Sequence, residues 1–292
     1  MTGATQDTTG REGTGQHTTD HHSTGQISTD EGRRMKIGLI TTGQGPRDYD
    51  RYFSGIARAL GVEVEILSEH ILDPLDWEQI RPHLAKGAAP VLGAHVHVPG
   101  ATGNRLGEGW DHVYVDLGWA MQHFQSAIDR LEARGAGGIV LGCGTDFAPG
   151  QFRHAVPLIA PCDAVMQVVA SAVAGRKRLR LGLMSSIGHA VQDVALWDAQ
   201  PFADKLDVTY EGFEGNLMPA AERLAQGQHD LVVVWSFGLG TAASDVDCMA
   251  ARLERLLGCP VIMPHRVAAL SAFAIFPVGF DDQAMAGNTA AG

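Results

Sequence analysis

The sequence predicts an α/β fold of two pseudo-symmetric halves, each a mostly parallel sheet flanked by helices, with a cleft between them. The main observation is that two strand patterns occur twice. Residues 35–42 (MKIGLITT) return as 179–186 (LRLGLMSS), with basic, apolar, Gly and hydroxyl positions in the same order. A second apolar run, 139–143 (IVLGC), is matched by 232–236 (VVVWS). Alternating strand and helix patterns along the chain are typical of parallel sheets.

The second repeat ends in a cysteine in one half and a serine in the other. In two halves built on one plan, Cys143 and Ser236 are expected at equivalent strand ends, facing each other across the cleft. Ligands of α/β sheets bind outside the carboxyl ends of the strands. We therefore expect the chemistry to lie between the halves.

Hydrophobic periodicity predicts the elements of the first half in order. The strand over 37–42 leads through a Gly-Gln-Gly-Pro loop into a helix whose apolar positions run from Tyr49 to Leu60, and Gly61 closes this helix. Whether 70–118 closes over the cleft is left open by the sequence. The remaining expected elements are a strand over 62–67, a hairpin of 91–98 and 112–115, a helix over 121–131 and a strand over 138–142.

The second half repeats this scheme. Ser244 and Asp247 resemble a capping box that opens a helix ending at Leu257. The predicted domains are a first half over 35–160 plus 262–292 and a second half over 161–261. The expected elements are a linking helix over 163–174, strands over 179–185, 206–210, 231–235 and 259–263, and helices near 190–199, 216–226 and 266–275.

Residues 1–34 differ in composition from the rest of the chain. They are rich in Thr, Gly, His, Asp and Gln, and Ile27 is their only large aliphatic residue. Such a segment buries too little apolar surface to offset its ordering entropy. We expect a disordered tail.

Bulk composition excludes several classes of function. A net charge of −11 argues against nucleic-acid binding, which needs clustered Lys and Arg. No apolar stretch reaches the length of about 18–20 residues that a membrane span needs. The four cysteines show no C-x-x-C spacing, which favours free thiols in the cytoplasm. A homodimer is an open expectation.

Cys143 is the first candidate catalytic residue. It ends an apolar strand and enters the loop Gly144-Thr145-Asp146, which offers small side chains and backbone N–H groups. Such donors favour the thiolate, which serves as a base or a nucleophile. The alternative is a buried structural cysteine, the role predicted for Cys162, Cys248 and Cys259.

Two further loops complete the predicted site. Ser236, followed by Phe237 in a Gly-rich loop, is a hydrogen-bond donor for an anionic ligand, or an ordinary strand-end serine. The loop after the first strand combines Thr42, Gln44 and Arg47, a set that suits a carboxylate; a simple strand-to-helix turn is the alternative. The predicted substrate pocket is Thr42, Gln44, Arg47, Gly144, Thr145 and Phe237.

The histidines offer weaker signals. His95 and His97 lie on one face of a strand, a spacing that metals accept, but no third ligand is evident, and we predict no metal. His189 is either a general acid in the cleft or a histidine at a helix start.

Two segments carry a resemblance to a known family. Residues 37–47 (IGLITTGQGPR) resemble the opening of AroM-family proteins, and 140–147 (VLGCGTDF) is similar to that family's strand-plus-cysteine segment. The family is placed with the aspartate/glutamate racemase superfamily, which includes hydantoin racemases. The resemblance implies no cofactor and a cleft in which two cysteines flank the α-carbon of the substrate. Cys143 matches the first of these cysteines, and Ser236 stands at the second.

That substitution decides the predicted reaction. A serine hydroxyl is too weak an acid to exchange roles with a thiol. We therefore expect a cofactor-independent isomerase, decarboxylase or tautomerase that acts at the carbon α to the carboxylate of a small acid through the Cys143 thiolate, with Ser236 stabilising the developing charge. A degenerate metabolite-binding protein is one alternative. An amino-acid or hydantoin-type racemase, with His189 or another group as the second acid, is the other.

Overall fold

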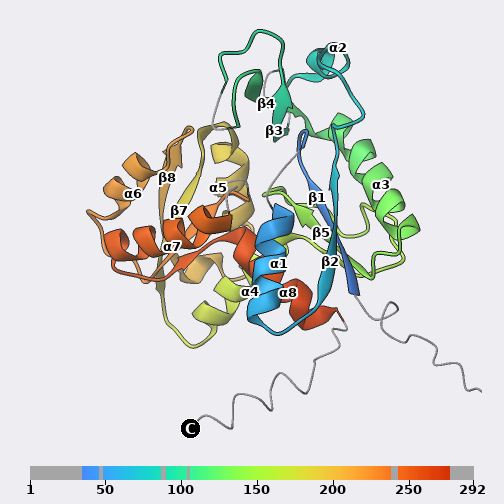
Figure 1. Cartoon of the computed structure of the whole chain (residues 1–292). Helices are drawn as coiled ribbons and strands as arrows, with labels where there is room; N and C mark the ends of the chain where they lie inside the picture. The colour runs from blue at the N-terminus through green and yellow to red at the C-terminus, as the bar shows by residue number, and fades with distance from the viewer. Residues whose placement is uncertain (1–34, 46–48, 87–89, 104–105, 238–242, 277–292) are drawn as a thin grey trace, which may run out of the picture. The chain divides into compact units, whose positions relative to one another are not determined.

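The computed structural model describes residues 35–45, 49–86, 90–103, 106–237 and 243–276, apart from the side chains of 243–248. The expectations for the tail 1–34, for Arg47 and for the capping box at Ser244 lie outside the described residues. Within this part of the chain, two four-stranded parallel sheets and a hairpin are arranged as Figure 1 shows. The predicted α/β class is confirmed.

The first sheet has the strand order β2-β1-β5-β6, with every pair parallel. Apolar side chains alternate between its two faces, so one face packs on α3 and the other on α1 and α8. Gly61, at φ +69°, follows α1 as predicted. The bounds are β1 (Met35–Thr41), β2 (Val64–His70), β5 (Gly138–Gly142), β6 (Leu158–Ile159), α1 (Tyr49–Ala59), α3 (Leu117–Ala133) and α8 (Pro264–Ile275).

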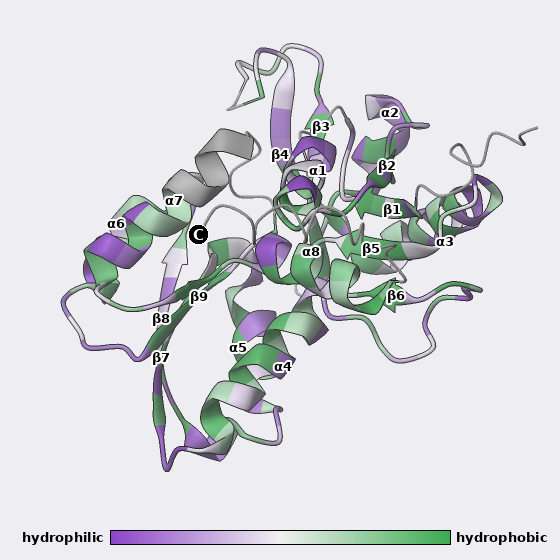
Figure 2. Ribbon diagram, turned by 60° about the horizontal axis from the view of Figure 1, so that its bottom comes forward, coloured by the Kyte–Doolittle hydropathy of each residue, from purple (hydrophilic) through white to green (hydrophobic). Residues whose placement is uncertain are grey.

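The second sheet has the order β8-β7-β9-β10, again all parallel. One face packs on α4 and α5, and the other on α6 and α7. Figure 2 shows β9 and β5 hydrophobic along their length, as strands covered on both faces require. The bounds are β7 (Leu179–Ser186), β8 (Leu206–Phe213), β9 (Leu231–Trp235), β10 (Val261–Ile262), α4 (Pro161–Ala174), α5 (Ala190–Asp198), α6 (Met218–Leu224) and α7 (Ala243–Leu257).

The internal repeat extends to strand register. Ile37 pairs with Gly138 in the first sheet, and Leu181 pairs with Leu231 in the second. The offset that aligns 35–42 with 179–186 also relates Ile37 to Leu181. The offset that aligns 139–143 with 232–236 relates Gly138 to Leu231. The predicted pseudo-symmetry is therefore a property of the hydrogen-bonded sheets.

Two helices each follow a strand of one sheet and pack on the other sheet. Helix α4 follows β6 but packs in the core of the second sheet, whereas α8 follows β10 but packs in the core of the first. Both begin with proline as their first residue, at Pro161 and Pro264, where no backbone N–H is needed. This exchange joins the two sheets through buried apolar surface. The division of the chain at 160/161 and 261/262 stays a prediction about folding units.

The predicted hairpin is present as β3 (Val91–His97) and β4 (Trp110–Asp116), paired antiparallel. Leu92, Ala94 and Val96 on one of its faces are buried in the core of the first sheet. The sequence did not predict the short helix α2 (Trp77–Ile80), which carries an Asp76–Gln79 capping box, or the 3₁₀ turn at Arg81–His83 that follows it. No helix within the described residues is both long and apolar enough to cross a bilayer.

Candidate active site

Cys143 lies one residue beyond β5, at the carboxyl edge of the first sheet. Its side chain is buried, and the loop that follows folds back so that Thr145 donates hydrogen bonds to Sγ from both its backbone and its hydroxyl. A Cβ added to Gly144 would meet nothing within 4 Å, which leaves open space beside this loop. Thr145 and Gly144 therefore surround the thiol as the sequence predicts.

The thiol is not in the ionisation state that the sequence suggested. Burial raises the pKa of Cys143 to about 12, and the two Thr145 hydrogen bonds oppose this shift only in part. The rings of Phe124, Phe147 and Phe152 pack within 6 Å of one another in the same core and keep water out. In this structure the loop holds a protonated thiol, which is a proton donor rather than a base.

Ser236 occupies the equivalent position in the second sheet. The backbone N–H groups of Cys143 and Ser236 each donate to the carbonyl two residues back, at Leu141 and Val234, both at 2.8 Å. The two residues therefore leave their strands through the same turn. Ser236 is half-buried.

Phe237 crosses from the second sheet into the core of the first. It is buried, its ring centroid lies 5.1 Å from that of Tyr49, and its carbonyl accepts a hydrogen bond from the Tyr49 hydroxyl at 3.1 Å. A Cβ on Gly142 would lie 2.9 Å from the Phe237 ring. Phe237 thus joins the two sheets next to Cys143, and a substrate contact from it stays a prediction that requires the ring to move.

The loop after β1 is held to the hairpin by its own polar groups. The Gln44 amide nitrogen donates to the carbonyls of Leu72 at 3.3 Å and Leu75 at 2.7 Å, and its oxygen accepts from the His97 N–H at 2.7 Å. Both amide hydrogens are therefore engaged, and Gln44 positions the loop. Thr42 is half-buried at the same edge, and Arg47 lies outside the described residues.

Asp193 on α5 is a buried ionisable residue that the sequence did not single out. Only 4% of it is exposed, and its carboxylate accepts a hydrogen bond from the hydroxyl of Ser185, near the end of β7. Burial raises the pKa of Asp193 to about 7, and the Ser185 hydroxyl and the Trp235 indole oppose this shift only in part. A signal existed in the sequence, because a gap-free alignment of 41–53 with 185–197 sets Asp193 against the buried Tyr49.

Cys162 links Asp193 to the Cys143 loop. It is buried at the second position of α4, and burial, together with the nearby Cys143, Asp146, Asp193 and Asp163, raises its pKa well above the ordinary value. The packing role predicted for Cys162 is compatible with its burial. Its position beside Cys143 and Asp193 was not expected.

Comparisons with known proteins agree with these features. The family model described as AroM protein matches residues 37–274. The chain belongs to the AroM family. No curated protein sequence matches it.

Solved structures that are similar to this AroM chain include two racemases. Allantoin racemase from Klebsiella pneumoniae is 16% identical, with a TM-score of 0.49, over 82% of this chain and 87% of its own. Glutamate racemase from Campylobacter jejuni subsp. jejuni is 13% identical, with a TM-score of 0.49, over 85% of this chain and 88% of its own.

The AroM chain covers the carboxyl edges of its two sheets with the β3–β4 hairpin. The Tyr114 hydroxyl on β4 lies 2.7 Å from the Ser186 hydroxyl, and the Gln192 amide on α5 donates to the carbonyl of Val91 on β3 at 3.5 Å. Because His97 also binds Gln44, the hairpin contacts both sheets. Burial, with a smaller contribution from nearby His112, lowers the pKa of His189 to about 4, so His189 is neutral near pH 7.

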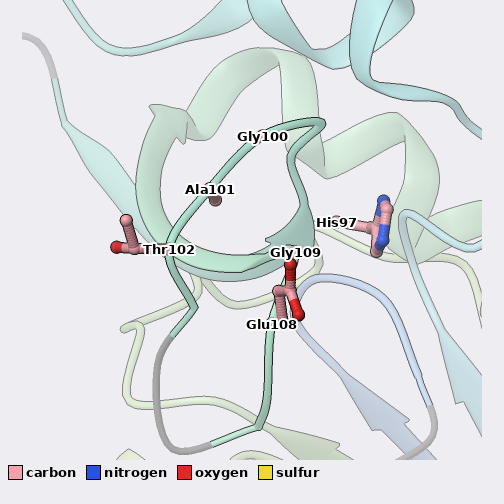
Figure 3. A pocket seen from close by; sticks show the side chains of 6 residues that line it. All are labelled: His97, Gly100, Ala101, Thr102, Glu108 and Gly109. Carbon is pink, nitrogen blue, oxygen red and sulfur yellow. The ribbon is translucent and has the colours of Figure 1, made fainter.

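Neither hollow on the described surface is lined by Cys143 or Ser236. One lies at the hairpin tip between His97 and Glu108 (Figure 3), and the other lies between α4, β10 and α8. Within the described ranges, no group of three His, Cys, Asp or Glu side chains is arranged to hold a metal ion. The pair His95 and His97 gains no third ligand there.

Proposed function

We propose that this AroM chain is a cytoplasmic, cofactor-independent enzyme that moves a proton at the carbon α to the carboxylate of a small acid, with Cys143 as the proton donor. The observation that carries this proposal is the buried Cys143 thiol, held by Thr145 at the carboxyl edge of a parallel sheet. A Cβ on Gly144, the residue after Cys143, would meet nothing within 4 Å, so the loop that follows the thiol borders open space.

A protonated thiol fits reactions that pass through an enolate. Loss of a proton or of CO₂ from the α-carbon leaves an electron pair on the substrate, and Cys143 returns a proton to that carbon. Thr42 and the backbone N–H group of Gly144 are proposed to bind the carboxylate, while Thr145 holds the thiol. Ser236 is proposed to donate to the enolate oxygen from the other sheet. Isomerisation, decarboxylation and tautomerisation all use this step.

The test is α-proton exchange in D₂O, followed by proton NMR on small 2-amino acids, 2-hydroxy acids, malonates and hydantoins. Cys143→Ala should lower exchange of the active compound by about 10²–10⁴-fold, the usual contribution of one acid–base group. Cys259→Ala is the matched control, since Cys259 is also a buried free thiol but precedes β10, at the amino edge of the second sheet rather than the carboxyl edge. This control should retain the wild-type rate.

Two results would contradict the proposal. Equal rates for the wild type and Cys143→Ala would remove Cys143 from the reaction. Saturable binding of a compound without exchange, decarboxylation or isomerisation would favour a metabolite-binding protein instead.

A further inference from the structure

The proposed reaction needs a group that removes a proton as well as one that returns it. Cys143 is protonated, and the Ser236 hydroxyl is too weak an acid to exchange protons with a thiol. The group that removes the proton must therefore be another ionisable residue, and the described part of the second half holds a candidate.

Asp193 meets this requirement by its position. It is buried on α5, its carboxylate accepts from Ser185 at the carboxyl end of β7, and it lies beside the Trp235 indole, one residue before Ser236. The second sheet therefore holds a buried carboxyl group near its carboxyl edge, as the first sheet holds the Cys143 thiol at its own carboxyl edge.

The internal repeat supports the same assignment. Tyr49, at the position equivalent to Asp193, reaches the other sheet and donates to the Phe237 carbonyl. Both positions are buried and their polar atoms form hydrogen bonds. A carboxyl group at such a position is costly to bury, and no ion pair offsets that cost among the described residues.

We propose that Asp193 is the second proton-exchanging residue of the site, while Ser236 keeps its role as hydrogen-bond donor to the enolate oxygen. This inference rests on the proposed function. The Asp193 carboxylate removes the α-proton, the electron pair of the C–H bond stays on the substrate as an enolate, and the Cys143 thiol protonates the same carbon. Neutral Asp193 and a Cys143 thiolate remain, and the reverse reaction or solvent returns the proton.

The surroundings of Asp193 set its pH response. Because burial raises its pKa to about 7, both protonation states are populated near neutrality, as an acid–base group requires. The neighbouring Cys143, Cys162 and Tyr210 have raised pKa values and therefore stay neutral near pH 7. The ionisable groups facing or influencing this region are Cys143 and Asp146 after β5, Cys162 and Asp163 on α4, Tyr210 on β8, Tyr114 on β4, and His189 before α5.

The experiment compares Asp193→Asn, Asp193→Glu and wild type by α-proton exchange between pH 5 and 9 on the compound that the wild type exchanges. Asp193→Asn keeps the shape of the side chain and should lower exchange by about 10²–10⁴-fold. Asp193→Glu should restore part of the rate with a displaced pH midpoint. Asp198→Asn, on the exposed side of the same helix, is the matched control and should match the wild type.

The outcomes separate this inference from the proposed function. An active wild type with an equally active Asp193→Asn, or with a pH profile that the substitution leaves unmoved, overturns the role of Asp193 alone. A wild type that exchanges no compound contradicts the proposed function and this inference with it. If Asp193→Asn does not fold, the infrared band of a protonated carboxyl in Asp193→Glu decides: its loss between pH 6 and 8 supports the assignment, and its absence at pH 6 overturns it.

Discussion

The two sheets share their packing positions and differ in their polar ones. Phe53 and Trp197 stand at equivalent positions of α1 and α5, and both are almost fully buried. At the carboxyl edges, by contrast, the equivalent positions hold different residues: Tyr49 corresponds to Asp193, and Cys143 corresponds to Ser236. The repeat therefore preserves what builds a core, while the ionisable groups are distributed unequally. A symmetric scaffold here carries an asymmetric set of proton donors and acceptors.

The same asymmetry appears at the helices that pass from one sheet to the other. Cys162 on α4 and His265 on α8 each follow the initial proline of their helix, and both are buried. Neither ring nitrogen of His265 has a hydrogen-bond partner within the described residues. Burial, with a smaller contribution from Arg266, lowers the pKa of His265 to about 4. Helix α4 thus buries a thiol at its second residue, and helix α8 buries a neutral imidazole at the same position.

The prediction with the largest expected effect tests whether the cores of the two halves are packed equally. Phe53→Ala and Trp197→Ala should each lower the free energy of unfolding by about 3–5 kcal/mol, because each leaves a large cavity in a core. Urea denaturation followed by circular dichroism measures both. Leu60→Ala, at an exposed position after α1, is the control. A loss below about 1 kcal/mol for only one of the two would show that the halves are not equivalent in packing.

A second prediction uses two buried titratable groups, Asp193 and His265, whose pH effects have opposite signs. Asp193 has a folded pKa of about 7 against an ordinary value of 3.8, so its contribution to stability is present at low pH and is lost as pH rises from about 4 to 7. His265 has a folded pKa of about 4 against 6.5, so its contribution is lost as pH falls from about 6.5 to 4. His189, whose pKa burial also lowers to about 4, adds to the His265 slope, so the wild type should gain stability between pH 4 and 6.5.

Single substitutions should reveal each slope. Relative to the wild type, the free energy of unfolding of Asp193→Asn should rise by roughly 3 kcal/mol from pH 4 to 6.5, since about 1.4 kcal/mol corresponds to each unit of pKa shift. Relative to the wild type, that of His265→Gln should fall by roughly 3 kcal/mol over the same range. Urea titrations at a series of pH values give both slopes. Parallel slopes in the two variants would mean that neither group titrates as its burial requires.

The smallest effect concerns the loops that follow β1 and β7. Gly43 has φ +87°, and a Cβ there would lie 2.2 Å from the His95 carbonyl oxygen, so Gly43→Ala should cost about 1–3 kcal/mol through strain and displacement of the hairpin. The equivalent residue of the second half, Ile187, is 58% exposed, and Ile187→Ala should change stability by less than about 0.5 kcal/mol. Similar losses in both variants would contradict the asymmetric attachment of the hairpin.

Sequence periodicity located the long elements well. The strands over 138–142 and 231–235 coincide with β5 and β9, and the hairpin lies within a few residues of its predicted place. Strands β6 and β10 cover only two residues each, which is too short for a period to register. Strand β10 was expected because Gly258 and the run that follows it mark a break, whereas β6 was missed.

The site residues show where pattern reasoning ends. On α5, Val191 is 87% exposed while Asp193 is 4% exposed, the reverse of what hydrophobicity predicts. This helix faces the carboxyl edge of its sheet and the N-terminus of α4, so its buried side is set by neighbours that are distant in sequence. The repeat of 35–42 in 179–186 ends before α5, and only the burial of Tyr49 in the structure draws attention to Asp193 at the equivalent position.

The sequence by itself determined the α/β class, the doubled plan and the placement of Cys143 and Ser236 at equivalent strand ends, because these follow from local periodicity and from the repeat. Tertiary structure alone decided the ionisation states. The pKa of Cys143 depends on burial among aromatic rings from α3 and its own loop, and that of Asp193 on its burial beside β7 and β9. Desolvation arises from atoms brought together by the fold, and no pattern along the chain records it.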